Sequence, residues 1–323
     1  MSRALLPRLW LGSVLVGTLL LPLALGARGV AVMDERALLP TRVRAGAYPR
    51  TLEDPLGRPF QLAAPARRIV STVLAADEIL LELVPAERLA GLTYLLDEPE
   101  VSPSAERAPR GVPRVYGSAE QMLALEPDLV IVASYTQVSE VSPLLSAGVP
   151  SVRLQHFGRL ADIEANVELL GRAVGADDAA ARLVASMRSR IRRVQELPRI
   201  SPPPRVLLLD GLFTYGKNTL FDECVRLAGG INVAAELGVE GAGVLGFERA
   251  ITVTPDLIVV PTGGRAPEAF APHLMRRAPV TKYVQPRWPG AVHGLPSAWT
   301  GSVSHHVLRT MEALASLMRK PSP

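Results

Sequence analysis

The sequence contains a single cysteine, Cys224, and only a small excess of positive charge. With one thiol the chain forms no intramolecular disulfide, and about 270 residues bury a sufficient core without one. The formal net charge is +4 at pH 7, and it falls to +2 (+4 − 2) without Arg3 and Arg8. That balance argues against a nucleic-acid-binding or membrane-surface protein. The thiol falls in an apolar helical pattern, so we expect it to be buried and structural.

The chain also lacks the usual signatures of hydrolases and closed metal sites. No serine lies in the GxSxG elbow, and the five histidines show no ligand spacing such as HxxxH. His305 and His306 are adjacent, and neighbouring helical side chains point about 100° apart, so we expect them not to share one face. The sequence therefore offers no case for an enzyme, and we expect no resident metal or cofactor.

Two glycine-containing segments approach nucleotide-binding motifs without completing them. Residues 211–218 nearly spell a P-loop, but Asn218 stands where Ser or Thr would hold magnesium. Residues 241–246 match GxGxxG, yet the dinucleotide fingerprint requires a strand immediately before it, and residues 235–240 do not predict one. We expect residues 241–246 to form a loop.

The N-terminus predicts export. Arg3 and Arg8 precede an uncharged, mostly apolar stretch over residues 9–25, and small residues follow it. This layout is typical of a secretory signal peptide over residues 1–27, with cleavage after Gly26 or Ala27. An uncleaved membrane anchor is the alternative, because the stretch approaches the length of a spanning helix. No cysteine lies near the cleavage site, so we expect a periplasmic protein without a lipid anchor.

One sequence motif occurs twice in the chain, 128 positions apart. Glu120 or Glu248 opens a short helical stretch, Pro-Asp follows seven residues later, and a β-branched apolar run comes next. Pro127 and Pro255 end the helices, because proline disfavours the α conformation in the residue before it. Short runs that are apolar at every residue are typical of parallel strands buried on both faces. The repeat predicts two similar α/β lobes, with a small ligand bound in a cleft between them.

Composition and periodicity divide the rest of the chain into four parts. Residues 28–64 predict a tether and a small hairpin around residues 54–58. An N-terminal α/β lobe over 65–158, connecting helices over 159–203 and a C-terminal α/β lobe over 204–323 follow. The second connecting helix, over 177–197, is long for an α/β lobe, and we expect Asp177 or Asp178 to be its N-cap.

Several motifs in order resemble those of the substrate-binding proteins of ABC importers for iron-siderophores, haem and cobalamin, the class III periplasmic binding proteins. They are segments 68–80, 88–93, 125–131 and 227–232, with Trp299 and the terminal helix. The similarity runs from about Thr51 to Met318. It implies two Rossmann-like lobes joined by a single long α-helix, with modest closure around the ligand. It also implies a monomeric binding protein that catalyses nothing.

The resemblance assigns a docking role to Glu120 and Glu248. In this family one glutamate at the tip of each lobe meets arginines of the importer's transmembrane subunits. One acidic group per lobe suits a two-fold-symmetric partner, and bidentate pairing with arginine adds orientation. Each glutamate also suits the first turn of a helix, where an acid complements the dipole. Both roles can hold at once.

Ligand contacts are expected on the loops that follow the carboxyl ends of the strands, the usual ligand edge of such sheets. Six aromatic residues alternate there with small polar groups, which suits a large flat ligand with polar edges. For any single aromatic, buried packing explains its presence equally well. The predicted ligand-binding residues are Thr72, Tyr94, Tyr116, Ser134, Tyr135, Phe213, Tyr215, Lys217 and Trp299.

Departures from the family pattern bear on the cargo. Cobalamin binders carry Asp-Tyr-Pro after the second strand, where this chain has Asp97-Glu98-Pro99 and so lacks that aromatic wall. Haem carriers use a tyrosine before the first docking glutamate, and Tyr116 lies in that loop, where a phenolate could ligate ferric iron. Lys217 could pair with a ligand carboxylate or project into solvent. We expect a metal-chelate cargo, with an iron complex (siderophore or haem) ranked above a corrinoid; a sensory receptor with the same fold is the alternative.

Overall fold

The computed structural model describes residues 41–44, 46–53, 58–211, 213–245, 249, 253–263 and 291–319. These residues all belong to the unit Ala37–Pro323. The predicted signal peptide, much of the predicted tether and the docking residue Glu248 lie outside the described residues. Within the described ranges, no helix has the length and apolar character needed to cross a membrane.

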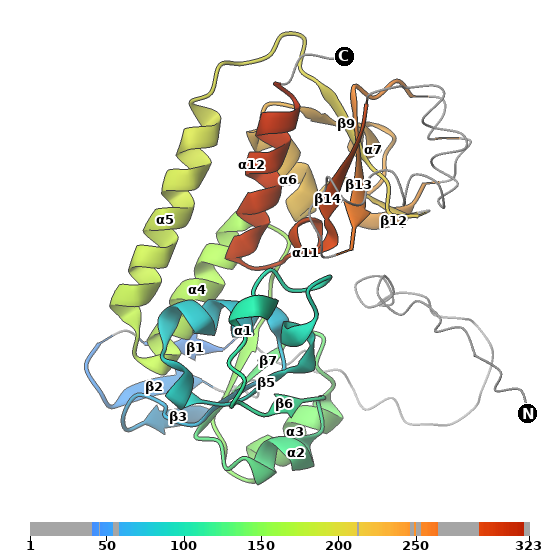
Figure 1. The fold of residues 1–323 in the computed structure, drawn as a ribbon. Coiled ribbons are helices and arrows are strands. Elements are labelled where there is room, and N and C mark those ends of the chain that lie inside the picture. The colour runs from blue at the N-terminus through green and yellow to red at the C-terminus, as the bar shows by residue number, and fades with distance from the viewer. Residues whose placement is uncertain are drawn as a thin grey trace, which may run out of the picture. The chain divides into compact units, whose positions relative to one another are not determined.

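A five-stranded parallel sheet with the order β6-β5-β4-β7-β8 forms the first lobe (Figure 1). Its strands are β4 (Ile69–Ser71), β5 (Leu89–Thr93), β6 (Arg114–Val115), β7 (Leu129–Ala133) and β8 (Ser151–Leu154). Its helices are α1 (Leu74–Leu83), α2 (Ala119–Ala124) and α3 (Val138–Ser146), with 3₁₀ turns η1 (Ala86–Arg88), η2 (Tyr94–Asp97) and η3 (Ala105–Arg107). The strand order reverses between β4 and β7, so this sheet has its topological switch point there.

Burial on both faces explains why β7 is apolar at every residue. Leu129, Ile131 and Ala133 belong to the apolar cluster that contains α1, whereas Val130 and Val132 belong to the cluster that contains α2 and α3. None of the five side chains is accessible to solvent. Successive side chains of a strand point to opposite faces, so helices on both sides require apolar residues throughout.

A four-stranded parallel sheet with the order β11-β9-β13-β14 forms the second lobe. Its strands are β9 (Arg205–Leu208), β11 (Ile231–Asn232), β13 (Leu257–Thr262) and β14 (Val292–Pro296). The accompanying helices are α6 (Leu220–Leu227), α7 (Val233–Glu236), α11 (Ser297–Thr300), the 3₁₀ turn η4 (His305–Val307) and α12 (Leu308–Leu317). Both sheets are parallel and helix-covered, as the sequence predicted.

A separate antiparallel pair joins β10 (Phe213–Tyr215) to β12 (Ala242–Val244). The expectation of a loop over residues 241–246 is therefore wrong for 242–244. Phe213 and Tyr215, which were expected on a loop after a strand, belong to strand β10 instead. Pairing satisfies the backbone groups of both segments, which would otherwise need other partners.

The repeated motif has the same structural role in both lobes. The Asp128 carboxylate accepts hydrogen bonds from the backbone N–H groups of Arg67 (2.6 Å) and Arg68 (2.9 Å), just before β4. Asp256 accepts one from the N–H of Arg205 (2.8 Å), at the start of β9. In return, Arg68 donates from Nε to the carbonyl of Glu126, the residue before Pro127, at 2.9 Å. Arg205 donates from Nε to the carbonyl of Thr254, the residue before Pro255, at 3.2 Å. Each Pro-Asp thus ties its strand to the neighbouring parallel strand.

Two helices, α4 (Leu160–Val174) and α5 (Asp177–Gln195), lie between the two sheets in the sequence. Helix α5 contacts α4 and α1, and it also contacts α6 and α12 of the second lobe (Figure 1). Gly175 has φ of 70° and ends α4 with a left-handed turn. The N-cap of α5 is Ala176, so the prediction of Asp177 or Asp178 is wrong, by one or two residues. Both aspartates lie in the first turn instead, where they complement the helix dipole.

The segment before the first lobe is a three-stranded antiparallel sheet. Its strands are β1 (Arg42–Val43), β2 (Arg50–Glu53) and β3 (Pro59–Leu62), in that order. The β2–β3 pairing flanks residues 54–58, where the sequence predicted a hairpin. Arg50 fastens this sheet to the helices, because it donates to the Arg172 carbonyl (2.7 Å) and pairs with Asp177 (2.8 Å).

Candidate functional site

The carboxyl ends of the strands in the two lobes meet. Ser297, directly after β14, donates from Oγ to the carbonyl of Glu100, in the segment after β5, at 2.5 Å. Gly263, directly after β13, lies so close to the Glu100 side chain that an added Cβ would sit 2.7 Å from Oε1. Gly158, after β8, is next to Asn218, after β10: a Cβ at Gly158 would lie 3.7 Å from the Asn218 carbonyl oxygen. Segments that follow strands of the two lobes are therefore in contact, next to some of the loops predicted to bind ligand.

Most exposed large apolar side chains of the described residues lie on segments that follow strands or on the β10–β12 pair. Among the described residues, those on the loops after β6 and β7, at the start of α3, or on the β10–β12 pair are Tyr116 (69% exposed), Tyr135 (54%), Val138 (41%), Phe213 (48%) and Val244 (60%). The sixth of this kind, Leu197, follows α5. Phe213 and Val244 are direct partners in the β10–β12 pair, and exposed apolar groups on such segments suit a ligand or partner site.

Hydrogen bonds within the first lobe hold the loops at its switch point. Thr72 donates from both its backbone N–H and its hydroxyl to the Ile131 carbonyl (3.1 and 3.4 Å). The Ser134 carbonyl accepts from Nη2 of Arg153 at 2.6 Å. Of the three residues predicted here, Thr72 and Ser134 are half-buried and Tyr135 is exposed. These contacts hold the backbone on either side of β7's end, and Tyr135 follows directly, with its ring centroid 6.3 Å from that of Phe157.

Two carboxyl groups that the motifs did not single out lie near the site tyrosines. Asp77, in the first turn of α1, is fully buried: Oδ2 accepts from the Thr93 N–H (2.8 Å), and no described residue hydrogen-bonds to Oδ1. Burial raises the pKa of Asp77 well above its usual value, and burial also raises the pKa of Asp210, just beyond β9. The pKa of Tyr135 is raised first by desolvation and then by the Asp77 carboxyl. The pKa of Tyr215 is raised first by desolvation and then by the Asp210 carboxyl. Tyrosine is already protonated at neutral pH, and these upward shifts keep both phenols so, able to donate a hydrogen bond.

Tyr94 and Tyr116 form a stacked pair, with ring centroids 4.9 Å apart and planes 16° from parallel. The register of the sheet brings them together, because Thr93 of β5 pairs with Val115 of β6 and each tyrosine directly follows one of these two residues. Tyr94 is half-buried, whereas Tyr116 is exposed. Gly117 follows with φ of 93°, a left-handed conformation that lets the chain turn directly into α2.

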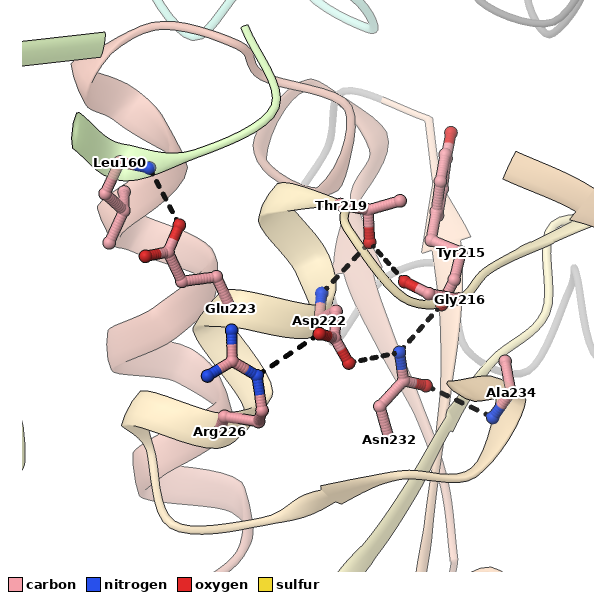
Figure 2. Close-up of polar contacts among 9 residues, drawn as sticks. All are labelled: Leu160, Tyr215, Gly216, Thr219, Asp222, Glu223, Arg226, Asn232 and Ala234. Atoms are coloured by element: carbon pink, nitrogen blue, oxygen red, sulfur yellow. Dashed lines mark hydrogen bonds and ion pairs between the residues drawn. The ribbon is translucent and has the colours of Figure 1, made fainter. Parts of the chain in front are cut away.

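Asn232, which ends the family-like segment 227–232, holds the backbone of Tyr215 in the second lobe (Figure 2). Its Nδ2 donates to the Tyr215 carbonyl (2.9 Å) and to Oδ1 of Asp222 (3.1 Å). Thr219 caps α6 by accepting from the Asp222 N–H (3.1 Å), and its hydroxyl donates to the Gly216 carbonyl (2.8 Å). Strand β10 is thus fixed to the first turn of α6, which gives segment 227–232 a positioning role.

The remaining predicted residues are placed as follows. Lys217 is exposed, next to β10. Trp299, in α11, is half-buried, and the Arg309 guanidinium lies 5.8 Å from its ring centroid, a cation–π contact. Glu120 is exposed in the first turn of α2, which suits both docking and the helix dipole. Glu248 lies outside the described residues, so its role stays a prediction.

A buried polar network joins the lobes beside these loops. Glu78 of α1 accepts from the hydroxyl of Ser304 (2.5 Å), in the second lobe, and from that of Ser102 (2.7 Å), in the first. Oγ of Ser104, in the first lobe, lies 2.8 Å from Nε2 of His306, in the second. All five residues are less than a tenth exposed. Burial raises the pKa of Glu78 to about 7 and lowers that of His306 to about 2.

The expectation that His305 and His306 diverge is wrong. Their ring centroids lie 4.0 Å apart. The two residues open the 3₁₀ turn η4, where packing into the lobe junction sets the side-chain directions, so α-helical spacing does not apply. In the part of the chain that the structure describes, no three His, Cys, Asp or Glu side chains are placed to hold a metal ion.

Three surface hollows lie away from the predicted ligand residues. They have volumes of about 390, 310 and 560 Å³ and are lined mainly by α4, α5 and α12. None of the three includes a predicted ligand residue in its wall. The candidate site therefore rests on the meeting sheet edges and on the apolar groups exposed there.

Two parallel α/β lobes with touching carboxyl edges are the architecture of a two-lobed solute-binding protein. The family model described as "Periplasmic binding protein" matches residues 69–282, more than half of the chain. The chain belongs to this family.

Relatives and solved structures agree on the class. The chain is 24% identical over 249 residues to the uncharacterized ABC transporter substrate-binding lipoprotein YvrC of Bacillus subtilis (72% of this chain, 74% of the relative). It is 26% identical over 248 residues to a cobalamin-binding protein of Halobacterium salinarum (74% of this chain, 66% of the relative).

Two solved structures have the same fold. One is the periplasmic haem-binding protein RhuT from Roseiflexus sp. RS-1 (TM-score 0.62, 24% identity, 78% of this chain and 98% of that one). The other is an ABC-type Fe³⁺-hydroxamate transport protein from Saccharomonospora viridis (TM-score 0.63, 18% identity, 85% and 100%). At these identities the likeness establishes the fold.

Proposed function

We propose that this protein captures a metal-chelate ligand between its lobes and delivers it to an ABC importer. The observation that carries the proposal is that the exposed large apolar side chains lie mostly on segments that follow strands and on the β10–β12 pair, in two lobes that touch through the loop contact of Ser297 with Glu100. A water-exposed surface of this kind is stabilised when a large, partly apolar molecule covers it. We propose that the contacting side chains are those predicted from the sequence, together with two neighbours of the site tyrosines: Phe157, whose ring centroid lies 6.3 Å from that of Tyr135, and Asp210, whose carboxyl acts on Tyr215.

The ligand is ranked as an iron complex, siderophore or haem, ahead of a corrinoid. Relatives and structural neighbours are named for cobalamin, haem and Fe³⁺-hydroxamate, which share a metal held in an organic chelate. Tyr116 is an exposed phenol on the loop where haem carriers place a tyrosine, although it lies closer to the docking glutamate than theirs. The protonated phenols of Tyr135 and Tyr215 supply hydrogen bonds to polar ligand edges. Lys217 supplies a positive charge for a carboxylate.

Delivery requires docking to the importer, and Glu120 is presented for it. Its carboxylate is exposed at the start of α2, on the lobe that carries Tyr116. With Glu248 it would give one acidic contact per lobe for the two transmembrane subunits. We further propose that the protein is a monomer exported through residues 1–27, without a lipid anchor or a resident cofactor, and that it catalyses no reaction.

The test is uptake of the cargo by cells carrying the Glu120→Ala/Glu248→Ala double variant. We expect transport to be lost while the purified variant binds ligand with unchanged affinity. Glu140→Ala is the matched control, because Glu140 also lies in a first helical turn, that of α3. Wild-type transport in the double variant would reject docking and leave only the helix-dipole role for these glutamates.

The alternative, a sensory receptor with the same fold, is not favoured. Relatives and neighbours carry transport-related names. A receptor would bind the same ligand yet leave uptake unchanged when the gene is deleted, so the deletion strain distinguishes the two functions.

A further inference from the structure

The stacked pair of Tyr94 and Tyr116 rests on a scaffold centred on Arg114. The Arg114 guanidinium donates to both carboxylate oxygens of Asp97 at 2.7 Å, in a bidentate pair. Asp97 is the last residue of η2, the 3₁₀ turn that begins with Tyr94. Arg114 therefore fixes the turn that carries the inner ring of the stack. These hydrogen bonds also lower the pKa of Asp97, which keeps the pair charged.

The backbone of Arg114 fixes the outer ring through Gln121. The Gln121 side chain donates from Nε2 to the Arg114 carbonyl (2.9 Å) and accepts at Oε1 from the Tyr116 N–H (2.9 Å). One amide of α2 thus clamps the chain on both sides of Val115. Further hydrogen bonds from the guanidinium to the carbonyls of Val112 (2.6 Å) and Pro109 (3.2 Å) immobilise Arg114 itself.

We propose that Arg114 is a positioning residue that preorganises the Tyr94–Tyr116 pair as a platform for a planar conjugated macrocycle. One face of the Tyr116 ring lies on Tyr94, and the residue as a whole is 69% exposed, which leaves the other face of the ring for a ligand. A flat macrocycle can cover that face by stacking, whereas a globular hydroxamate chelate has no flat surface to match it. Rings held in place before binding lose little entropy when the ligand arrives.

This inference rests on the proposed function, and it selects one ligand class within it. The macrocycle that fits is a porphyrin such as haem, because a corrin ring is puckered and a cobalamin carries axial ligands on both of its faces. The stack supplies an aromatic surface in a chain that lacks the Asp-Tyr-Pro aromatic at residues 97–99. The register of β5 and β6, rather than a motif, creates the surface.

The test compares Arg114→Lys with Arg188→Lys in the purified protein. Lysine keeps the charge but cannot make the bidentate pair. Arg188 is the matched control because it also contacts a carboxylate, that of Glu164 (2.7 Å), on helices α5 and α4. With haemin and cyanocobalamin as probes, we expect Arg114→Lys to weaken the affinity for haemin about tenfold, and Arg188→Lys to leave it unchanged.

A double-mutant cycle separates positioning from general damage to the fold. In the Tyr94→Ala/Tyr116→Ala background, Arg114→Lys should cost no further affinity, because its effect passes through the rings. An equal loss with and without the rings would overturn the positioning role, and so would wild-type affinity of Arg114→Lys. Near-ultraviolet circular dichroism needs no ligand: Arg114→Lys should reduce the tyrosine signal as Tyr116→Ala does, and an unchanged signal would overturn the scaffold.

The outcomes also separate this inference from the proposed function. If the wild type binds ferrioxamine or cyanocobalamin but not haemin, the platform is wrong while the binding protein stands. If it binds none of the three probes, the metal-chelate function fails, and the dichroism alone decides whether Arg114 orders the tyrosines.

Discussion

Replacing Glu78 with glutamine should make the protein's stability less sensitive to alkaline pH. Glu78 is 2% exposed and accepts hydrogen bonds from Ser102 and Ser304 across the lobe junction. Burial raises its pKa from 4.5 to about 7, against the opposing effects of the serine hydroxyls and of Arg309. The folded state therefore holds the Glu78 proton more tightly than the unfolded state, so this contribution to stability is full below pH 4.5 and is lost as pH rises through 7.

The difference between pH 4.5 and 7 corresponds to about 3 kcal/mol at roughly 1.4 kcal/mol per pH unit. A neutral glutamine has no such loss. We thus expect the free energy of unfolding of Glu78→Gln, relative to wild type, to rise by about 3 kcal/mol between pH 4 and pH 8. The buried histidines titrate in both proteins, so their effect cancels in this difference.

Urea denaturation at several pH values measures this difference, provided that the slope m is the same in both proteins. Ser102→Ala gives a second comparison, because losing a hydrogen-bond donor to the Glu78 carboxylate raises the pKa of Glu78 further. The fall in unfolding free energy with rising pH should therefore occur at higher pH in Ser102→Ala than in the wild type. A difference between Glu78→Gln and wild type that stays constant from pH 4 to pH 8, or that changes in the opposite direction, would refute the buried-carboxyl argument.

Three further predictions concern other parts of the fold. Gly216→Ala should destabilise the protein by at least about 2 kcal/mol, because an added Cβ would lie 1.9 Å from the backbone oxygen of Val239, while Gly111→Ala, which meets nothing within 4 Å, should change the thermal midpoint little. Burial raises the pKa of Cys224 to about 12, so a thiol reagent should react only after denaturation, and rapid reaction of the native protein would contradict its burial. The lowered pKa of His306 keeps it neutral when folded, so stability should fall as pH drops below 6.5, by about 3 kcal/mol at pH 4.5; His306→Gln should lack this part of the decline in acid denaturation curves.

The fold prediction rested on the periodicity of apolar residues and on the residues that end helices and form turns. The all-apolar run 129–133 could be recognised as a strand covered on both faces, and the structure shows its residues divided between two helical layers. The repeated Pro-Asp was sufficient to predict two lobes, although its mechanism was not visible in the sequence. Asp128 and Asp256 bind backbone N–H groups more than fifty residues before them in the chain. Which partner an aspartate finds at that separation depends on the assembled sheet.

The candidate site was predicted only as a set of loops. Strand order places those loops on one edge, so Tyr116, Tyr135 and Phe213 could be proposed without coordinates. The stacking of Tyr94 on Tyr116 depends on the register of β5 and β6, which no local pattern specifies. The Glu78–Ser304 contact joins residues 226 positions apart, and nothing near either one in sequence indicates it.

The central claim is that the meeting edges of the two lobes bind a metal chelate. Titration of the purified protein with haemin, ferrioxamine and cyanocobalamin, followed by tryptophan fluorescence and ligand absorbance, tests it most directly, because Trp299 lies beside the lobe contact made by Ser297. We predict saturable one-to-one binding of one ligand class with a dissociation constant of about 1 μM or lower, equivalent to about −8 kcal/mol. The absence of saturable binding to all three would contradict the account.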